Sequence, residues 1–309
     1  MSKTAIVFPG QGSQALGMLS DIASEHAIVT ETFAQASEVL GYDLWALVQD
    51  GPVEDLNRTD RTQPALLAAS VAIWRVWNEE GGAQPDFLAG HSLGEYSALV
   101  CAGAIAFEDA IKLVELRGQY MLEAVPEGTG SMAAIIGLDD DAIAKACEDA
   151  SEGQVVSPVN FNSPGQVVIA GHKEAVERAS SLCKEAGAKR ALPLAVSVPS
   201  HCSLMSPAAD KLAAQLDSIE INEPTLKVVN NVDVAIESSP AAIKDALKRQ
   251  LFSPVRWSET VQFFAANDVT TQIEVGPGKV LSGLAKRIEK SVSGVATTDV
   301  ASLTAALGK

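Results

Sequence analysis

The sequence predicts an α/β protein in which helices cover a mostly parallel sheet and a second, smaller α/β unit is inserted into the first. Two observations predict this arrangement. Short apolar runs alternate with helix-like segments along most of the chain, as they do in parallel sheets. One block, between residues 131 and 195, breaks the alternation because two strand-like runs follow one another directly. The chain has 309 residues, which is enough for one large domain or two smaller ones.

The strands of the main sheet are predicted from short apolar runs. These runs lie at Ala5–Phe8, Phe87–Gly90, Leu226–Val229 and Gln272–Val275. The helices that cover the sheet are predicted from longer runs between them, such as Ala65–Glu80 and Phe107–Glu123.

The interrupting block reads as strand, helix, strand, strand, helix, strand. Its elements are expected at Met132–Ile136, Asp140–Ala150, Val155–Phe161, Gln166–Ala170, Lys173–Ala186 and Lys189–Ala195, with Asn162-Ser163-Pro164-Gly165 as the turn between the two middle strands. This βαββαβ order is ferredoxin-like. We therefore expect an inserted domain over residues 128–196, a large domain formed by residues 1–127 and 197–309, and an active site where the two meet.

Composition excludes several classes of function. The net charge of −16 disfavours nucleic-acid binding, because a phosphate backbone would be repelled. The apolar run before Pro9 is too short for a signal peptide, and no segment approaches the ~20 apolar residues of a membrane span. The four cysteines, Cys101, Cys147, Cys183 and Cys202, show neither zinc-site nor disulfide-framework spacing. A cytoplasmic enzyme without a metal is predicted.

The sequence GHSLG, at Gly90–Gly94, lies between a predicted strand and a helix-like run, Glu95–Cys101. A glycine on each side of the serine lets strand and helix pack closely around a sharp turn, which exposes the hydroxyl. The motif therefore predicts acyl transfer through Ser92. The alternative is an ordinary glycine-rich turn.

A serine nucleophile needs a base, most often a histidine, and the chain has four. His26 and His172 are expected to be structural, and His91 is better placed to support the turn than to accept the proton. His201 remains as the candidate base, since it lies in a loop after an apolar strand; the alternative is a surface histidine. Cys202 is a weak rival nucleophile, because an adjacent cysteine and histidine rarely have the required geometry.

The loop after the first predicted strand, Phe8–Gln14, reads FPGQGSQ. It lacks the lysine of a phosphate loop and the third glycine of a dinucleotide fingerprint, so it does not indicate nucleotide binding. Two interpretations remain open. The loop can donate a backbone N–H to an oxyanion, together with the N–H of Leu93, or it can be a plain strand-to-helix turn.

Arg117 lies on the apolar stripe of its predicted helix, with Leu113 and Val114 one turn before it and Tyr120 and Met121 one turn after it. No carboxylate is three or four residues away. A buried arginine needs an anion, because an unpaired buried charge is costly. A substrate carboxylate would serve, held through two parallel N–H···O bonds. The alternatives are a distant acidic side chain or a snorkelling arginine.

Six motifs occur in order along the chain: FPGQGSQ, TQPAL (Thr62–Leu66), GHSLGE (Gly90–Glu95), the helical Arg117, the PSH loop (Pro199–His201) and EVGPG (Glu274–Gly278). In order and spacing they resemble the bacterial malonyl-CoA:acyl carrier protein transacylases over essentially the whole chain. The resemblance implies an α/β-hydrolase-like large domain with a ferredoxin-like insert, which agrees with the architecture expected above.

The resemblance also implies catalytic roles. Ser92 would be the nucleophile and His201 its base. The histidine would be oriented by a backbone carbonyl in place of an aspartate, and Gln250 stands at the matching position. Gln11 and Leu93 would donate backbone N–H groups to the oxyanion.

Substrate-binding roles follow from the same resemblance. Arg117 would bind the malonyl carboxylate and Gln63 would line the acyl pocket. Asn160 and Asn162 would contact the pantetheine arm. The implied reaction is ping-pong: Ser92 takes malonyl from coenzyme A and passes it to the phosphopantetheine thiol of acyl carrier protein, in fatty acid biosynthesis. No cofactor or metal is implied, because the coenzyme A thioester is the substrate.

The carrier proteins of this family are acidic, so an acidic enzyme would need a local basic patch to bind one. Candidates are Lys184, Lys189 and Arg190 in the insert and Lys286, Arg287 and Lys290 near the C-terminus, with solvated helix faces as the alternative. Three other functions remain open: a malonyl or methylmalonyl transferase of a polyketide pathway, a serine esterase or thioesterase, and a non-catalytic carrier-protein scaffold.

Overall fold

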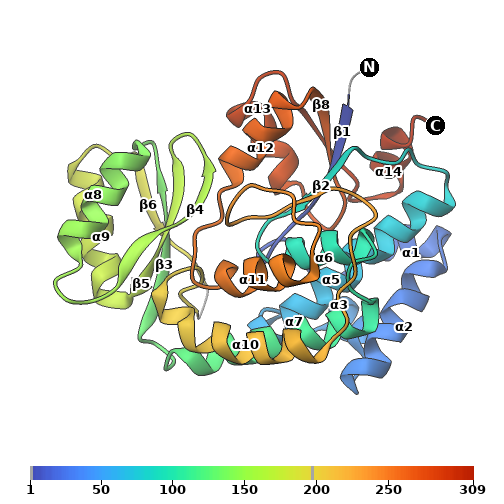
Figure 1. Cartoon of the computed structure of the whole chain (residues 1–309), viewed down its shortest axis with the longest axis horizontal. Coiled ribbons are helices and arrows are strands. Elements are labelled where there is room, and N and C mark those ends of the chain that lie inside the picture. Colours follow the sequence, from blue (N-terminus) through green and yellow to red (C-terminus); the bar gives the residue numbers. More distant parts are fainter. Residues whose placement is uncertain (1–2, 196–197) are drawn as a thin grey trace.

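The computed structural model describes residues 3–195 and 198–309. Two sheets, each with its own helices, form two lobes of unequal size (Figure 1). The predicted fold class, an α/β-hydrolase-like large domain with an inserted ferredoxin-like unit, is confirmed. The expected boundary between residues 196 and 197 lies outside the described residues, and the division into domains stays a prediction.

The large sheet has five parallel strands in the order β7-β2-β1-β8-β9. Their bounds are Lys3–Phe8 (β1), Phe87–Gly90 (β2), Val228–Val229 (β7), Val269–Glu274 (β8) and Ser293–Ala296 (β9). Compared with the prediction, β7 is shorter, β8 begins three residues earlier, and β9 is additional. Phe8 pairs with Gly90, so the loops that follow β1 and β2 leave the sheet side by side.

Both faces of the large sheet are covered by helices, and alternate residues of β1 point to opposite faces. Ile6 and Phe8 belong to one apolar core, and Ala5 and Val7 to the other. The first core contains residues of α1 (Ser20–Glu25), α2 (Ile28–Leu40), α3 (Leu44–Asp50), α4 (Val53–Leu56), α5 (Thr59–Glu79), α6 (Gly94–Cys101), α7 (Phe107–Ala124), η1 (Ser203–Met205), α10 (Ser206–Ser218), α11 (Pro240–Gln250) and α14 (Val300–Ala306). The second contains residues of α12 (Trp257–Ala266) and α13 (Val280–Ile288).

Helix α5 begins six residues before the predicted Ala65, so the TQPAL motif is helical. The predicted segment did not include Pro64, and proline generally disfavours a helix interior. Here Pro64 lies in the second turn, where it removes a single backbone donor, and the rest of this long helix packs in the core. The consequence for the site is that Gln63 lies on a helix that packs against α7.

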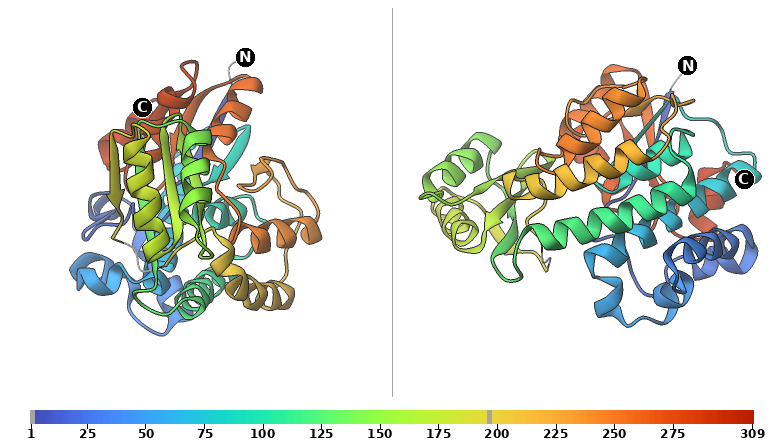
Figure 2. Two further views of the ribbon diagram at one scale, coloured as in Figure 1. Left: turned by 90° about the vertical axis from the view of Figure 1, so that its left-hand side faces the viewer. Right: turned by 60° about the horizontal axis from the view of Figure 1, so that its bottom comes forward.

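The small sheet has four antiparallel strands in the order β4-β5-β3-β6. Its elements are β3 (Gly130–Ile136), α8 (Asp140–Ala150), β4 (Val156–Ser163), β5 (Gln166–His172), α9 (Lys173–Glu185) and β6 (Arg190–Pro193). Figure 2 shows α8 and α9 side by side on the outer face of this sheet. The predicted four-residue turn is shorter, because Asn162 and Ser163 belong to β4 and only Pro164 and Gly165 connect the strands.

The inner face of the small sheet packs against the loop that carries His201. Met132, Val168 and Ala170 form one cluster with Cys202. Two backbone hydrogen bonds join β4 to Val255, which follows α11 in the large lobe. The two lobes are therefore packed together where the predicted site residues lie. Among the described residues, no helix has the length and apolar character of a membrane span.

Candidate active site

Ser92 occupies a sharp turn between β2 and α6, with a backbone φ of 52°. A side chain rarely adopts this left-handed conformation, so the surroundings must hold it in place. The flanking glycines leave no room for a side chain. A Cβ on Gly90 would lie 1.8 Å from the carbonyl carbon of Gly94, and a Cβ on Gly94 would lie 2.1 Å from the Phe8 oxygen. The motif is thus the strand–turn–helix elbow that the sequence predicts.

His201 lies at the N-terminal side of η1 and reaches the serine from the other side of the site. Its Nε2 is 2.7 Å from Ser92 Oγ, and its Nδ1 is 2.7 Å from the backbone oxygen of Gln250. A carbonyl oxygen can only accept, so Nδ1 carries the proton and Nε2 is free to accept the serine proton. This pair has the geometry of a nucleophile and its general base.

The electrostatic surroundings keep His201 in its basic form. Burial lowers the pKa of His201 to about 3, and the positive charge of Arg117 acts in the same direction. The neighbouring Cys202 is not a competing nucleophile. Cys202 is 2% exposed, its thiol donates a hydrogen bond to the Pro199 oxygen at 3.2 Å, and burial raises the pKa of this thiol to about 11.

Arg117 projects from α7 toward Ser92 and is 2% exposed. Its Nη1 donates to Gln63 Oε1 at 2.7 Å, and its Nη2 donates to Gln250 Oε1 at 3.1 Å and to Ser92 Oγ at 3.4 Å. Tyr96 stacks beside the guanidinium, with its ring centroid at 5.3 Å. Within the described ranges, 3–195 and 198–309, Arg117 forms no ion pair with a carboxylate. The distant acidic partner considered from the sequence is therefore not in direct contact.

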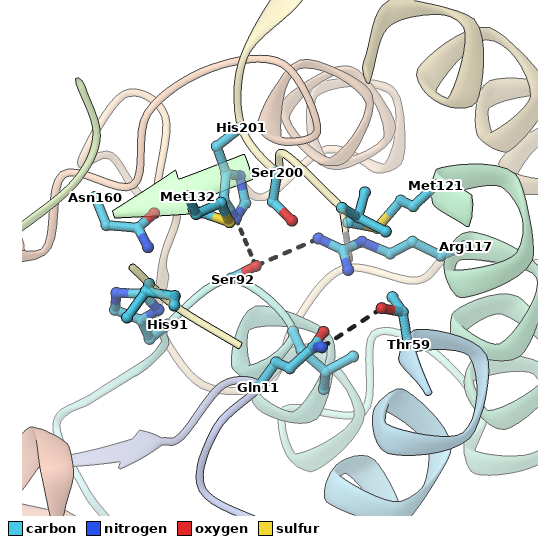
Figure 3. Close-up of a pocket in the computed structure, with 13 residues that line it drawn as sticks. Gln11, Thr59, His91, Ser92, Arg117, Met121, Met132, Asn160, Ser200 and His201 are labelled. Atoms are coloured by element: carbon cyan, nitrogen blue, oxygen red, sulfur yellow. Dashed lines mark hydrogen bonds between the residues drawn. The ribbon is translucent and has the colours of Figure 1, made fainter. Parts of the chain in front are cut away.

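A small cavity of about 100 Å³ brings these groups together (Figure 3). Both lobes contribute to its lining, which consists of Gln11, Thr59, His91, Ser92, Leu93, Arg117, Met121, Met132, Asn160, Leu194, Val198, Ser200 and His201. Pockets that enclose a drug-sized ligand measure roughly 300–1,000 Å³. The cavity therefore suits a short acyl group, and the rest of a coenzyme A molecule would have to remain outside it.

Two predicted binding residues lie elsewhere. Gln63 was expected to line the pocket, but it is fully buried behind Arg117, because α5 packs against α7 there. It holds the guanidinium in place. Asn162 was expected to contact pantetheine, but its Oδ1 lies 2.8 Å from His91 Nε2. That contact joins the turn beside Ser92 to the small lobe. Asn160 does line the cavity, and among the described residues its buried Oδ1 has no hydrogen-bond partner.

Gln11 and Leu93 line the cavity from adjacent loops. Leu93 immediately precedes the first residue of α6, and Gln11 follows β1; neither amide donates a hydrogen bond to another described residue. The Gln11 side chain is held by Thr59, with Nε2 to Oγ1 at 3.4 Å (Figure 3). Free amides next to a nucleophile can stabilise an oxyanion.

Two buried residues that support the elbow, Asn231 and Glu95, are not among the predicted site residues. Asn231 accepts the Ser92 N–H and donates to the Gly90 oxygen, and Glu95 accepts from the backbone N–H of Asn231 and from the side chain of Gln250. Asn231 directly follows β7 and Asn230, so a polar pair at the end of an apolar strand was the available signal.

A family model described as the acyl transferase domain matches residues 5–305. The malonyl CoA-acyl carrier protein transacylase of Salmonella typhimurium is 66% identical over 307 residues, which cover 99% of this chain and 99% of that protein. The chain belongs to the malonyl-CoA:acyl carrier protein transacylase family. The protein of the same name from Bacillus subtilis is 47% identical over 300 residues, covering 97% of this chain and 94% of the relative. The family predicted from the six motifs is confirmed.

Solved structures of this transacylase family have the same fold. An acyl carrier protein S-malonyltransferase from Vibrio cholerae matches with a TM-score of 0.96 and 72% identity, over 98% of this chain and 99% of that chain. A malonyl-transacylase in complex with its type II PKS acyl-carrier protein matches with a TM-score of 0.99 and 66% identity, over 99% of both chains.

Proposed function

We propose that this protein transfers a malonyl group from coenzyme A to the phosphopantetheine thiol of acyl carrier protein, in fatty acid biosynthesis. The observation that carries the proposal is the position of Arg117. Its guanidinium lies 3.4 Å from the Ser92 hydroxyl in a cavity that fits a short acyl group. A serine–histidine pair accounts for acyl transfer in general, and a buried cation beside it accounts for an acyl group that ends in a carboxylate.

In the first half-reaction Arg117 binds the malonyl carboxylate, which places the thioester carbonyl next to Ser92. The serine oxygen attacks this carbon while His201 Nε2 takes the hydroxyl proton. The backbone amides of Gln11 and Leu93 bind the oxyanion. When the tetrahedral intermediate collapses, the carbon–sulfur bond breaks and the coenzyme A sulfur receives the proton from His201. The product is malonyl-Ser92.

In the second half-reaction the carrier's thiol reverses these steps. His201 takes the thiol proton, the sulfur attacks the malonyl ester, and the Ser92 oxygen leaves with the proton from His201. Asn160 lines the cavity from the small lobe, and its unpaired Oδ1 is an acceptor for an amide N–H of the pantetheine arm. We retain Asn162 only as a residue that positions His91.

Carrier docking requires positive charge at the surface. The six candidate cations, Lys184, Lys189, Arg190, Lys286, Arg287 and Lys290, are exposed. None forms an ion pair with another described residue, so their charges are available to an acidic partner. Arg190 begins the edge strand β6 of the small lobe, and Lys189 directly precedes it. Leu194, which directly follows this strand, lines the cavity.

One relative favours a second carrier. The structure with a TM-score of 0.99 is a complex of a malonyl-transacylase with a type II PKS acyl-carrier protein. Transfer to a polyketide carrier is therefore the alternative to transfer in fatty acid synthesis. We place either reaction in the cytoplasm, since Cys147, Cys183 and Cys202 are buried free thiols, as is usual in a reducing compartment.

The test is intact-mass spectrometry of the purified protein after incubation with malonyl-CoA alone. We expect one malonyl adduct that maps to Ser92, persists without an acceptor, and disappears when carrier protein is added. Ser92→Ala should form no adduct and should keep its melting temperature. Rapid steady-state release of free malonate without an acceptor thiol would instead identify a hydrolase. Carrier binding without any adduct would identify a scaffold.

A further inference from the structure

Glu95, the last residue of the GHSLGE motif, is a buried carboxylate outside the catalytic cavity. It lies in the first turn of α6 and is 2% exposed. Its Oε2 accepts two hydrogen bonds of 2.9 Å, one from the backbone N–H of Asn231 and one from Gln250 Nε2. Burying a carboxylate is costly, so its retention behind the active site needs an explanation.

The two donors to Glu95 are the groups that fix the catalytic pair. Asn231 binds both sides of the serine turn. Gln250 binds the histidine through its backbone oxygen, and its Nε2 also donates to the Ser92 carbonyl at 3.0 Å. One carboxylate oxygen therefore connects the elbow, the loop after β7 and the end of α11.

The carboxylate also determines which way the Gln250 amide faces. An ionised carboxylate can only accept hydrogen bonds, so it selects the NH₂ end of the amide. The carbonyl end must then face Arg117, and it accepts from Nη2 at 3.1 Å. With the amide reversed, an NH₂ group would face the guanidinium and two donors would oppose each other.

We propose that Glu95 is a positioning residue for the acyl transfer proposed above: through Gln250 and Asn231 its carboxylate fixes the approach of Ser92 to His201 and the orientation of Arg117. In a serine–histidine–aspartate triad the acid contacts the histidine directly. Here the carboxylate acts one residue further away, through an amide. This inference rests on the proposed function, because that function supplies the malonyl substrate. The positioning role of Glu95 itself is argued from the hydrogen bonds described above.

The charges around Glu95 come from several elements. Arg117 of α7 favours its ionised form, whereas Asp233 in the loop after β7 disfavours it. Tyr96 is adjacent on α6, and Glu237 lines the same small internal cavity as Glu95. Burial raises the pKa of Glu95 to about 7. Protonated Glu95 carries an O–H donor, whereas Asn231 and Gln250 both require an acceptor from this carboxylate.

The experiment compares Glu95→Gln and Glu95→Ala with wild type, with Glu115→Gln as the matched control. Glu115 is another buried carboxylate, 6% exposed on α7, where it pairs with Lys112 at 2.8 Å. Three quantities are measured: the melting temperature, the rate of malonyl-Ser92 formation, and the rate of inactivation by phenylmethylsulfonyl fluoride. The last reagent reports the serine–histidine pair without needing Arg117, because it carries no carboxylate.

We expect Glu95→Gln to react about 10-fold more slowly and Glu95→Ala about 100-fold more slowly with both reagents, which is the range found when a hydrogen-bond partner that orients a metal-binding side chain is removed. The melting temperature of Glu95→Gln should equal or exceed that of wild type. The wild-type rates should fall as the pH is lowered through about 7 and meet those of Glu95→Gln below it. Glu115→Gln should keep wild-type rates.

Wild-type rates in Glu95→Gln would overturn the inference. So would a loss of rate that accompanies a loss of melting temperature in both Glu95→Gln and Glu115→Gln, because the carboxylate would then be structural. The proposed function fails separately: wild type would form no malonyl adduct, while its reaction with phenylmethylsulfonyl fluoride would still depend on Glu95.

Discussion

The backbone N–H of Ser92 donates to Oδ1 of Asn231 at 2.8 Å, although the two residues are 139 positions apart in the sequence. The same Asn231 side chain donates through Nδ2 to the Gly90 oxygen at 2.7 Å. It therefore pairs one backbone group on each side of the turn that holds Ser92 in its left-handed conformation. The Ser92 N–H is therefore engaged, whereas the neighbouring Leu93 N–H donates no hydrogen bond to another described residue.

Asn231→Ala should leave the part-buried Ser92 N–H and the buried Gly90 oxygen without these partners. Each unsatisfied group costs about 1–3 kcal/mol. We expect a lower melting temperature and at least 10-fold slower formation of malonyl-Ser92, because the serine loses its fixed orientation. Asn222→Ala, at an exposed position, is the control and should change neither quantity. A wild-type rate of malonyl-Ser92 formation in Asn231→Ala would show that the turn keeps its conformation without the Asn231 side chain.

Arg117→Ala should affect malonyl transfer far more than acetyl transfer, because only malonyl carries a carboxylate for the guanidinium. Loss of a desolvated, hydrogen-bonded charge pair costs roughly 2–5 kcal/mol, which corresponds to a loss of about 30-fold or more in kcat/KM for malonyl-CoA. Arg117→Lys should fall between wild type and alanine, since lysine keeps the charge but not the planar fork. Equal losses for both thioesters would contradict a role in carboxylate binding.

Gly94→Ala tests the packing of the elbow. The added Cβ would lie 2.1 Å from the Phe8 oxygen, which is a backbone atom and cannot move away without distorting β1. We expect a loss of about 3 kcal/mol or more in the free energy of unfolding. Gly283→Ala in α13 is the matched control, because nothing lies within 4 Å of its Cβ position. That substitution should stabilise the protein by about 0.5–1 kcal/mol. Chemical denaturation measures both.

The elbow and the base could be predicted from the sequence because their signals are local. The five-residue motif GHSLG places a serine between two glycines at the end of a predicted strand. His201 was the one histidine expected in a loop after a strand. The order of elements in the small lobe was visible for the same reason: its strands and helices are short and follow one another directly.

The supporting residues depend on contacts across more than 100 positions, which no local pattern shows. Glu95 and Asn231 meet 136 residues apart, and Gln250 reaches Ser92 across 158. Gln63 was assigned to the pocket wall from the family resemblance, and the helix after it was expected to begin only at Ala65. The longer α5 instead places Gln63 behind Arg117, a difference that follows from tertiary packing rather than from propensity.

Two buried groups in the site should make opposite contributions to the pH dependence of stability. The pKa of His201 is lowered from 6.5 to about 3, so below pH 6.5 the unfolded chain binds a proton that the native protein excludes, and this group's stabilisation is lost on acidification. The pKa of Glu95 is raised from 4.5 to about 7, so between these values the native protein binds the extra proton and gains stability on acidification.

Between pH 7 and pH 5 each contribution amounts to about 2 kcal/mol, so in wild type the two nearly cancel. Removing one group should expose the other. As the pH falls from 7 to 5, the free energy of unfolding of Glu95→Gln should fall by about 2 kcal/mol, and that of His201→Gln should rise by about 2 kcal/mol, while that of wild type stays nearly constant. Urea unfolding of the three proteins at pH 5, 6 and 7 measures these differences, since all other titrating groups are shared. Parallel curves for the two variants would contradict the assignment, because it requires slopes of opposite sign.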